Sequence, residues 1–339
     1  MHSEISASQT DHDRVYNLIM AGWAAQTVRT LASLSVAEHV SSGPLSAAQI
    51  AELASSNPDM TYRVLRAGAA LGLLTYDADE AEFSGTPALQ VLHKDSPLCL
   101  KHYAMATLSD TYWLPTLRMP ETVARGRNHV VEVLGCTPFE HLGQNQDAAR
   151  LFSAAMTDLS TPLIREAIQF IDVSKARFVV DVGGADGAFL AELMQLHPRL
   201  TGTVLDLPQV MPGVVEEVRR RGLEERMTGT EGDFFAYVPA ADLYLLKFIL
   251  HDWDDESCRK ILRNIRRAMQ PGARVVIVEM IVSHDSIGAA LMDVGMMTCF
   301  TGREREEDEF THLLEAAELK VDRTTPLHPP YRLIEATAM

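Results

Sequence analysis

Apolar residues recur every three or four positions from Val15 to about Phe170, and this spacing predicts a mostly helical first half. Within it, the pattern predicts short helices over 45–54 and 60–71, with a turn between them at Pro58. Two short segments that follow, 73–76 and 82–84, predict a small hairpin. Helix, turn, helix and hairpin in this order are typical of a winged-helix module.

The pattern changes after Ile171, where runs rich in β-branched residues alternate with helical segments. The runs predict strands over 178–182, 202–207, 243–246 and 275–279. Such alternation predicts a parallel sheet covered by helices, and the amphipathic segment 256–269 is expected to pack on that sheet. We therefore expect a winged-helix-like domain over 1–100, a helical connection over 101–170 and an α/β domain over 171–339.

The charge and the apolar runs of the chain argue against nucleic acid and membrane partners. The 339 residues carry a net charge of −16, which repels a phosphate backbone, and between Ser46 and Thr75 only Arg63 and Arg66 are basic. No nucleic acid partner is therefore expected from the winged helix. The longest apolar runs are far shorter than the roughly 20 residues of a membrane span, and the start of the chain lacks a signal-peptide pattern. These features predict a cytoplasmic protein with no membrane partner.

The four cysteines are scattered and form no Cys-x-x-Cys pair, so the sequence predicts neither a metal site nor a disulfide framework.

The most informative segment is a buried strand that runs into a glycine-rich turn and then a helix, over 178–196. This arrangement predicts a nucleotide-type site at the carboxyl edge of the sheet. The dinucleotide fingerprint Gly-x-Gly-x-x-Gly fails, because Ala185 and Ala188 stand where its second and third glycines belong, and a P-loop lysine is absent. An acid at the end of the next strand, Asp206, is placed where a carboxylate can accept hydrogen bonds from both ribose hydroxyls.

The spacing Asp181-x-Gly183-x-x-x-Gly187 resembles the first motif of methyltransferases that use S-adenosylmethionine (SAM). The segment from Leu246 to Glu256, with Lys247, His251, Asp252 and Trp253, makes the resemblance specific. It is similar to the plant caffeic acid and flavonoid O-methyltransferase family and its bacterial small-molecule relatives, and the similarity runs over nearly the whole chain. The resemblance implies a Rossmann-like class I SAM-dependent methyltransferase domain, an N-terminal winged-helix dimerisation domain, and a homodimer.

Residue by residue, the resemblance implies a catalytic set, a cofactor set and a substrate set. His251 corresponds to the general base, with Glu279 and Glu304 as the carboxylates that orient its ring. The cofactor set, which binds SAM and its product S-adenosylhomocysteine, is Met156, Ser160, Gly183, Asp206, Leu207, Asp233, Phe234 and Lys247. The substrate set is Trp113, Asp293, Met296 and Phe300, with Tyr112 and Met297 in the same region.

The implied reaction moves a methyl group to a hydroxyl of a small aromatic natural product of phenolic, phenazine or polyketide type, as in antibiotic biosynthesis. A phenol titrates near ~10 and histidine near ~6.5, so an imidazole can accept the phenolic proton during attack on the methyl carbon. Two alternative hypotheses for the function remain: a relative that uses the SAM site in hydroxylation or decarboxylation, and a ligand-sensing winged-helix regulator. The identity of the acceptor, and whether an N-hydroxyl is accepted, are not fixed by the sequence. The family usually has a glycine where Ala185 stands, and the effect on SAM affinity is also left open.

Overall fold

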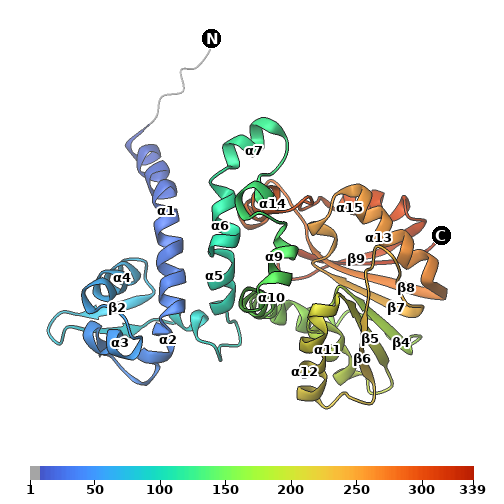
Figure 1. Cartoon of the computed structure of the whole chain (residues 1–339), viewed down its shortest axis with the longest axis horizontal. Coiled ribbons are helices and arrows are strands. Elements are labelled where there is room, and N and C mark those ends of the chain that lie inside the picture. The colour runs from blue at the N-terminus through green and yellow to red at the C-terminus, as the bar shows by residue number, and fades with distance from the viewer. Residues whose placement is uncertain (1–7) are drawn as a thin grey trace, which may run out of the picture. The chain divides into compact units, whose positions relative to one another are not determined.

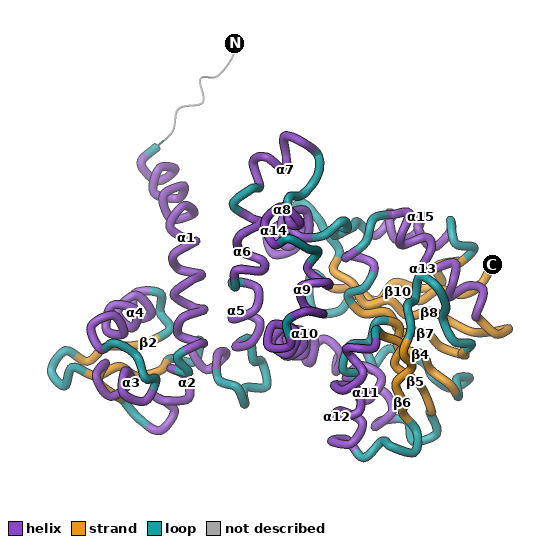
Figure 2. Tube along the Cα trace, in the orientation of Figure 1, coloured by secondary structure: helices purple, strands orange, loops and turns teal. Residues whose placement is uncertain are grey.

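A computed structural model describes residues 8–339 and divides into two compact units (Figures 1 and 2). Of the described residues, one unit contains 8–110 and 154–159, and the other contains 111–153 and 160–339. The three domain boundaries expected from the sequence stay a prediction.

The first unit is mostly helical and contains the expected helix, turn, helix and hairpin. Helix α1 (Gln9–Ser33) begins at a capping box in which Ser8 and Asp11 exchange hydrogen bonds. A three-stranded sheet of order β1-β3-β2 includes the predicted hairpin. Leu31, Ile50, Leu65 and Phe83 are fully buried between these elements and form the core of the unit. The remaining elements are α2 (Val36–His39), β1 (Leu45–Ser46), α3 (Ala47–Leu53), α4 (Pro58–Ala70), β2 (Leu74–Asp77), β3 (Glu82–Gly85) and α5 (Lys101–Thr107).

The second unit is built on a seven-stranded sheet of order β6-β5-β4-β7-β8-β10-β9. Its first five strands run parallel, and β10 is antiparallel to both of its neighbours. The strands are β4 (Phe178–Val182), β5 (Thr201–Asp206), β6 (Met227–Glu231), β7 (Ala241–Lys247), β8 (Met269–Met280), β9 (Leu319–Pro326) and β10 (Tyr331–Ala338).

The four predicted strands are confirmed as β4, β5, β7 and β8, and the predicted parallel sheet is confirmed over five strands, whereas β10 runs antiparallel to its two neighbours. Strands β9 and β10 are joined by a short turn over 327–330, which is sufficient for antiparallel neighbours, whereas parallel neighbours need a crossover. Strand β6 was also missed, because four of its five residues are at least partly exposed and give no apolar run.

Helices pack on the sheet through apolar faces. In α13 (Asp255–Ala268), Cys258, Ile261, Leu262 and Ile265 are fully buried in the same cluster as the core strands, as expected for this segment. Other helices are α6 (Asp110–Thr116), α7 (Met119–Arg125), α8 (Val130–Leu134), α9 (Pro138–Gln144), α10 (Gln146–Ala167), α11 (Ala188–Leu196), α12 (Met211–Arg221), α14 (Ile287–Cys299) and α15 (Glu307–Glu315). Across residues 8–339, none of the helices has the length and apolar character needed to cross a membrane.

The strand order reverses between β4 and β7, since β5 lies on one side of β4 and β7 on the other. In open α/β sheets, ligands bind beyond the carboxyl ends of the strands at such a switch point. The glycine loop follows β4 and the His251 segment follows β7, so the topology brings the two predicted motifs to this edge.

Candidate active site

The glycine loop needs glycine at both of its predicted positions. Gly183 and Gly187 have φ angles of +67° and +82°, which residues with a side chain rarely adopt. A Cβ atom on Gly183 would lie 2.6 Å from Ile249 Cδ1, and one on Gly187 would lie 2.5 Å from Met227 Cε. Both glycines therefore allow close packing and a tight turn from β4 into α11.

A buried carboxyl lies beneath the same loop. Asp181 is 1% exposed, and a Cβ atom on Gly184 would lie 2.5 Å from its Cγ. Burial raises the pKa of Asp181 to about 7, and the positive charge of Lys247 opposes that shift. Burial also lowers the pKa of Lys247, against the attraction of Asp181. The two side chains thus compensate each other's charge at the base of the loop.

Ala185 adopts the left-handed conformation, with φ of +52°, at the position where the family usually has glycine. Its N–H donates to Asp206 Oδ2 at 2.9 Å, which holds the loop in this conformation. For a residue with a Cβ atom this conformation costs about 1–2 kcal/mol.

We expect Ala185→Gly to raise the free energy of unfolding by about 0.5–1 kcal/mol. The gain is smaller than the strain because glycine also makes the unfolded chain more flexible. Thermal unfolding measures the change. Ala188→Gly, in the first turn of α11, serves as the matched control and should lower the melting temperature. A similar loss of stability in both variants would show that Ala185 is not strained.

Asp206 lies at the end of β5, where the sequence placed the acceptor for the cofactor ribose. Its two carboxylate oxygens accept the N–H groups of Ala185, at 2.9 Å, and of Leu207, at 2.7 Å. Each oxygen retains a second lone pair, so the carboxylate can also accept from two hydroxyls. Burial raises the pKa of Asp206. The acid thus both shapes the glycine loop and keeps capacity for a ligand.

We expect Asp206→Ala to weaken SAM binding at least about tenfold, because charge-assisted hydrogen bonds contribute roughly 1.5–3 kcal/mol each. Calorimetric titration measures the affinity, and thermal unfolding reports how far the loss of the two backbone acceptors disturbs the fold. Asp206→Asn keeps one carbonyl acceptor, so its SAM affinity should lie between those of Asp206→Ala and the parent protein. SAM affinity that is unchanged in both variants would remove Asp206 from the cofactor site.

The predicted adenine side is formed by the loop after β6. Asp233 is exposed, and its Oδ1 accepts the N–H of Phe235 at 2.8 Å, which fixes the turn. Phe234 contacts Trp253 with ring centroids 6.1 Å apart. Asn264, which the sequence analysis missed, donates from Nδ2 to the carbonyls of Phe234 and Phe235 at 2.9 Å each. A helix residue of α13 thereby anchors the loop.

The remaining cofactor candidates lie on β7 and α10. Lys247 ends β7, and its Nζ lies 4.6 Å from the centroid of the Phe248 ring. Met156 and Ser160 lie one turn apart on α10, and Ser160 is buried. Their contribution to cofactor binding stays a prediction.

His251 follows β7 in a short 3₁₀ turn (Leu250–Asp252), and its ring lies among three carboxylates. Nδ1 lies 2.9 Å from Glu304 Oε1, a hydrogen bond, and 4.0 Å from Glu279 Oε2. Nε2 lies 3.6 Å from Asp252 Oδ1, which is beyond hydrogen-bonding distance. The structure therefore brings both predicted carboxylates to His251, leaving Nε2 as the nitrogen available to another molecule.

The carboxylates control the protonation of this ring. Burial acts to lower the pKa of His251, but the negative charges of Glu279, Asp252 and Glu304 outweigh it and raise that pKa to about 10. Burial raises the pKa of Glu279 to about 7, with His251 opposing the shift. The cluster is thus built to stabilise a proton on the imidazole.

Glu279 has a second contact set that fixes the backbone before His251. It is fully buried on β8, and its Oε1 accepts the N–H groups of Ile249, at 3.0 Å, and Leu250, at 2.8 Å. The carboxylate thereby connects β8 to the turn that carries the histidine.

Arg305 is a further positioning residue that the sequence analysis missed. It is 0% exposed, and it donates to the carbonyls of Leu250 and Trp253 at 2.8 Å each. It also donates to Asp255 Oδ1 from Nη2 at 2.8 Å. One buried guanidinium therefore ties together the residues on both sides of His251.

Gly302 lies against the same turn. A Cβ atom there would lie 2.0 Å from the carbonyl oxygen of His251 and 2.3 Å from the backbone nitrogen of Trp253. Segment 302–305 thus holds the turn by backbone packing at Gly302, by a ring contact at Glu304 and by hydrogen bonds at Arg305.

An aromatic cluster lies next to the histidine turn. Phe139 is nearly parallel to Trp253, with centroids 5.9 Å apart, and contacts Phe300 at 5.7 Å. Tyr112 lies between Phe152, at 6.0 Å, and Phe300, at 6.4 Å, with interplanar angles of 22° and 28°. The Tyr112 hydroxyl is buried without a hydrogen-bond partner among the described residues. The cluster offers flat apolar surfaces and one unused polar group.

The predicted substrate residues occupy different positions around this cluster. Phe300 is part of it, and Met296 is buried on α14. Asp293 accepts the N–H of Glu304 at Oδ1, 3.0 Å away, so it supports the histidine site from α14. Trp113 is half-buried on α6, and its contact with a substrate stays a prediction.

Two family models match the chain. The O-methyltransferase domain matches residues 117–320, and the O-methyltransferase dimerisation domain matches residues 16–95. The mitomycin biosynthesis 6-O-methyltransferase of Streptomyces lavendulae is 28% identical over 97% of this chain and 95% of its own length.

Solved structures of O-methyltransferases are also similar to this chain over nearly its whole length. The structure of the mitomycin 7-O-methyltransferase MmcR has a TM-score of 0.90 and 27% identity, and covers 97% of this chain and 98% of that one. The O-methyltransferase NcsB1 from neocarzinostatin biosynthesis, in complex with SAM and 2-hydroxy-5-methyl naphthoic acid, has a TM-score of 0.79. It is 29% identical and covers 93% of this chain and 96% of that one. Together with the glycine loop and the histidine site, these matches show that the chain belongs to the O-methyltransferase family and is a SAM-dependent enzyme.

Proposed function

We propose that the protein transfers the methyl group of SAM to a hydroxyl of a small aromatic natural product, with His251 as general base. The observation that carries this proposal is the geometry of the histidine, whose Nδ1 lies 2.9 Å from Glu304 Oε1 while Nε2 has no hydrogen-bond partner among residues 8–339. The neutral form of this ring can accept a proton from a bound acceptor without losing its orientation, and because the carboxylates raise the pKa of His251, that form becomes more populated as pH rises.

The reaction follows from the charges of the site. When bound, SAM supplies an electrophilic methyl group on a cationic sulfur. His251 Nε2 would take the proton of the acceptor hydroxyl while Nδ1–H donates to Glu304, and the cofactor would leave as S-adenosylhomocysteine once its methyl group has passed to the acceptor oxygen. The imidazolium that forms is stabilised by the surrounding carboxylates, which raise the pKa of His251. General-base assistance of this kind supplies roughly 10²–10⁴-fold in rate.

The cofactor residues fit SAM on physical grounds. Asp206 retains acceptor capacity for two hydroxyls beside a loop that contains three glycines in five residues, and the buried Asp181 Oδ2 has no hydrogen-bond partner among the described residues. The carboxylates of Asp206 and Asp181 provide hydrogen-bond acceptors beside the glycine loop. Acceptors suit a ligand that carries ribose hydroxyls and a positive charge. We assign Gly183, Asp206 and Leu207 to the cofactor tail and ribose, with Asp233, Phe234, Lys247, Met156 and Ser160 around the rest.

The aromatic cluster supports an aromatic acceptor. Near-parallel rings of Tyr112, Phe152 and Phe300 offer faces on which a planar molecule can stack. A buried hydroxyl left without a partner costs about 1–3 kcal/mol, so a polar group on the acceptor is expected to pair with Tyr112. The relatives named above act in mitomycin and neocarzinostatin biosynthesis, which supports an antibiotic-type phenolic, phenazine or polyketide acceptor.

An acceptor panel tests the proposal. Purified protein is incubated with SAM carrying a deuterated methyl group and with phenols, hydroxyphenazines and hydroxynaphthoic acids, and products are analysed by mass spectrometry. We expect one labelled methyl on an oxygen of at least one acceptor. A decarboxylated or hydroxylated product without label would replace the proposal with the alternative SAM-site chemistry.

We also propose that the enzyme is a homodimer formed through its N-terminal domain. Helix α1 exposes large apolar side chains over more than two turns, and the dimerisation model of the family covers this segment. The exposed residues are Val15, Tyr16, Leu18, Ile19, Met20 and Trp23. Sedimentation should give twice the chain mass at micromolar concentration, whereas a stable monomer would contradict this assignment.

A further inference from the structure

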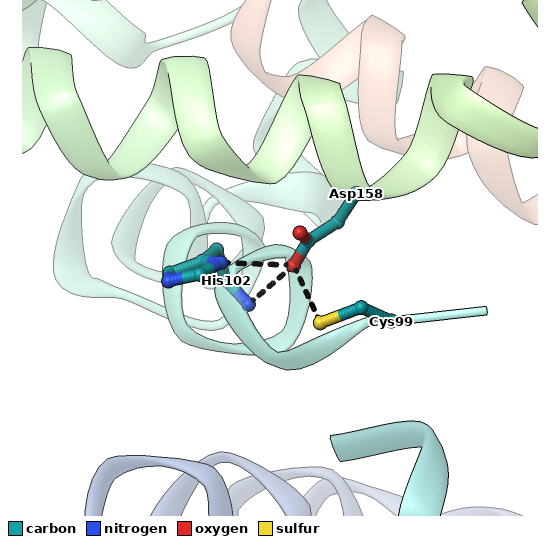
Figure 3. Close-up of side chains that lie close together, drawn as sticks. All are labelled: Cys99, His102 and Asp158. Atoms are coloured by element: carbon teal, nitrogen blue, oxygen red, sulfur yellow. Dashed lines mark hydrogen bonds and ion pairs between the residues drawn. The ribbon is translucent and has the colours of Figure 1, made fainter. Parts of the chain in front are cut away.

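A second cluster of ligand-type side chains lies in the first unit, where α5 begins beside α10. Cys99, His102 and Asp158 converge on one point, as Figure 3 shows. Cys99 Sγ lies 3.4 Å and His102 Nδ1 lies 3.1 Å from the same oxygen, Asp158 Oδ2. The ligand atoms of all three residues lie within 4.8 Å of one another.

We propose that Cys99, His102 and Asp158 bind a divalent cation such as Zn²⁺, which holds the start of α5 against α10. Zinc bonds of about 2.3 Å to sulfur and 2.0–2.2 Å to nitrogen and oxygen place tetrahedral neighbours roughly 3.3–3.7 Å apart. The separations of 3.4 Å and 3.1 Å from Asp158 Oδ2 are within a few tenths of an ångström of those edges. The ligand atoms of Cys99 and His102 lie within 4.8 Å of each other, so side-chain adjustments bring all three ligand atoms to one ion.

The sequence spacing and the charges agree with this ion. Cys99 and His102 form a Cys-x-x-His pair, a spacing typical of zinc ligands, which the search for Cys-x-x-Cys pairs did not consider. A thiolate and a carboxylate together neutralise a 2+ ion, so the complex carries no net charge. Lys101, the nearest basic side chain in sequence, is directed elsewhere and pairs with Glu38 at 2.5 Å.

The supporting contacts that a metal site needs are also present. Cys99 Sγ accepts the N–H of Lys101 at 3.4 Å, and Asp158 Oδ2 accepts the N–H of His102 at 2.8 Å. Cys99 is buried, whereas the His102 side chain is 34% exposed and gives an ion and one water ligand access. On binding, the thiol proton of Cys99 leaves to solvent and neutral His102 binds through Nδ1 with its proton on Nε2.

Cobalt is the probe for this site. Reduced, metal-free, full-length protein is titrated with Co²⁺, and we expect one equivalent per chain to produce a near-ultraviolet band from thiolate-to-cobalt charge transfer. The His251, Glu279 and Glu304 group also has ligand spacing but contains no sulfur, so it cannot produce this band. Cys99→Ser keeps a hydrogen-bond donor to Asp158 and should lose the band, whereas Cys136→Ser, in the second unit, should keep it.

Zinc binding gives a second readout that does not depend on absorption. Zinc should raise the melting temperature of the parent protein by about 3 °C or more. His102→Gln should weaken zinc affinity at least about tenfold with little change in metal-free stability, since this side chain is partly exposed. If the reduced parent protein binds neither metal, or if Cys99→Ser binds cobalt with the same band, the proposal is overturned and Asp158 only caps the start of α5.

Discussion

Replacing His251 with Ala is expected to lower turnover on a weakly acidic phenol at least ~10²-fold at neutral pH, the lower range for a general base. SAM affinity should change little, because the cofactor assignments rest on Gly183 and Asp206 and on the loop after β6. Turnover is measured with saturating SAM, and SAM affinity is measured by calorimetric titration without acceptor.

Two controls separate the lost base from a disturbed site. Removing the ring leaves Glu279 and Asp252 without their positive partner, and since burial raises the pKa of both carboxyls, these two groups are expected to take up protons. His251→Gln keeps a side chain that can donate to Glu304 and should lose as much activity with less loss of stability. His312→Ala, on the exposed surface of α15, should behave like the parent protein. Wild-type turnover in His251→Ala would show that another group, or none, removes the proton.

The second large effect is expected at Arg305. Arg305→Ala removes the charged donor from the carbonyls of Leu250 and Trp253, which keep only weaker donors such as the Cys258 thiol, and it leaves Asp255 without this guanidinium. Hydrogen bonds from a charged donor contribute about 1.5–3 kcal/mol each, and the Arg305 side chain is fully buried, so the melting temperature should fall by at least about 5 °C. Turnover should fall more than SAM affinity, because the freed turn carries His251.

Arg303 provides the matched control for Arg305. It lies two residues away and also pairs with Asp255, but its side chain is 50% exposed. Exposed ion pairs contribute at most about 1 kcal/mol, so Arg303→Ala should be nearly neutral. Arg305→Lys keeps the charge but loses the planar set of donors. Its melting temperature and turnover should therefore lie between those of Arg305→Ala and the parent protein. Equal stability and turnover in all these variants would mean that Arg305 does not position the histidine.

The parts of the fold that the sequence predicted well are those with a strong local signal. Strand β4 has the bounds that its apolar run predicts, and the hairpin of β2 and β3 lies where turn residues separate two short segments. The edge strands β6 and β9 and the inner strand β10 were not predicted. Most positions of β6 and β9 are at least partly exposed and resemble a loop, and the buried run of β10 is interrupted by the charged residue Glu335. Their pairing depends on neighbours far away in the sequence.

In the candidate site, too, contacts between residues far apart in the sequence could not be predicted from local patterns. No local pattern places Glu279 and Glu304 beside His251, and only the family resemblance predicted that arrangement. Arg305 was missed because it stands in a run of charged residues, Arg303 to Glu307, that is typical of an exposed surface. Its complete burial results from carbonyl groups of the 250–253 turn, which no sequence pattern reveals.

The most direct test of the account is the pH dependence of kcat/KM on one phenol for the parent enzyme and for His251→Ala. The carboxylates raise the pKa of His251, so the neutral ring becomes more populated as pH rises, and the parent rate should increase through an apparent pKa above the ~6.5 of free histidine. The deficit of His251→Ala should then shrink as the acceptor ionises near ~10, since an ionised phenol needs no base. A deficit that stays constant across this range, or no deficit at neutral pH, would contradict the assignment of His251 as the base.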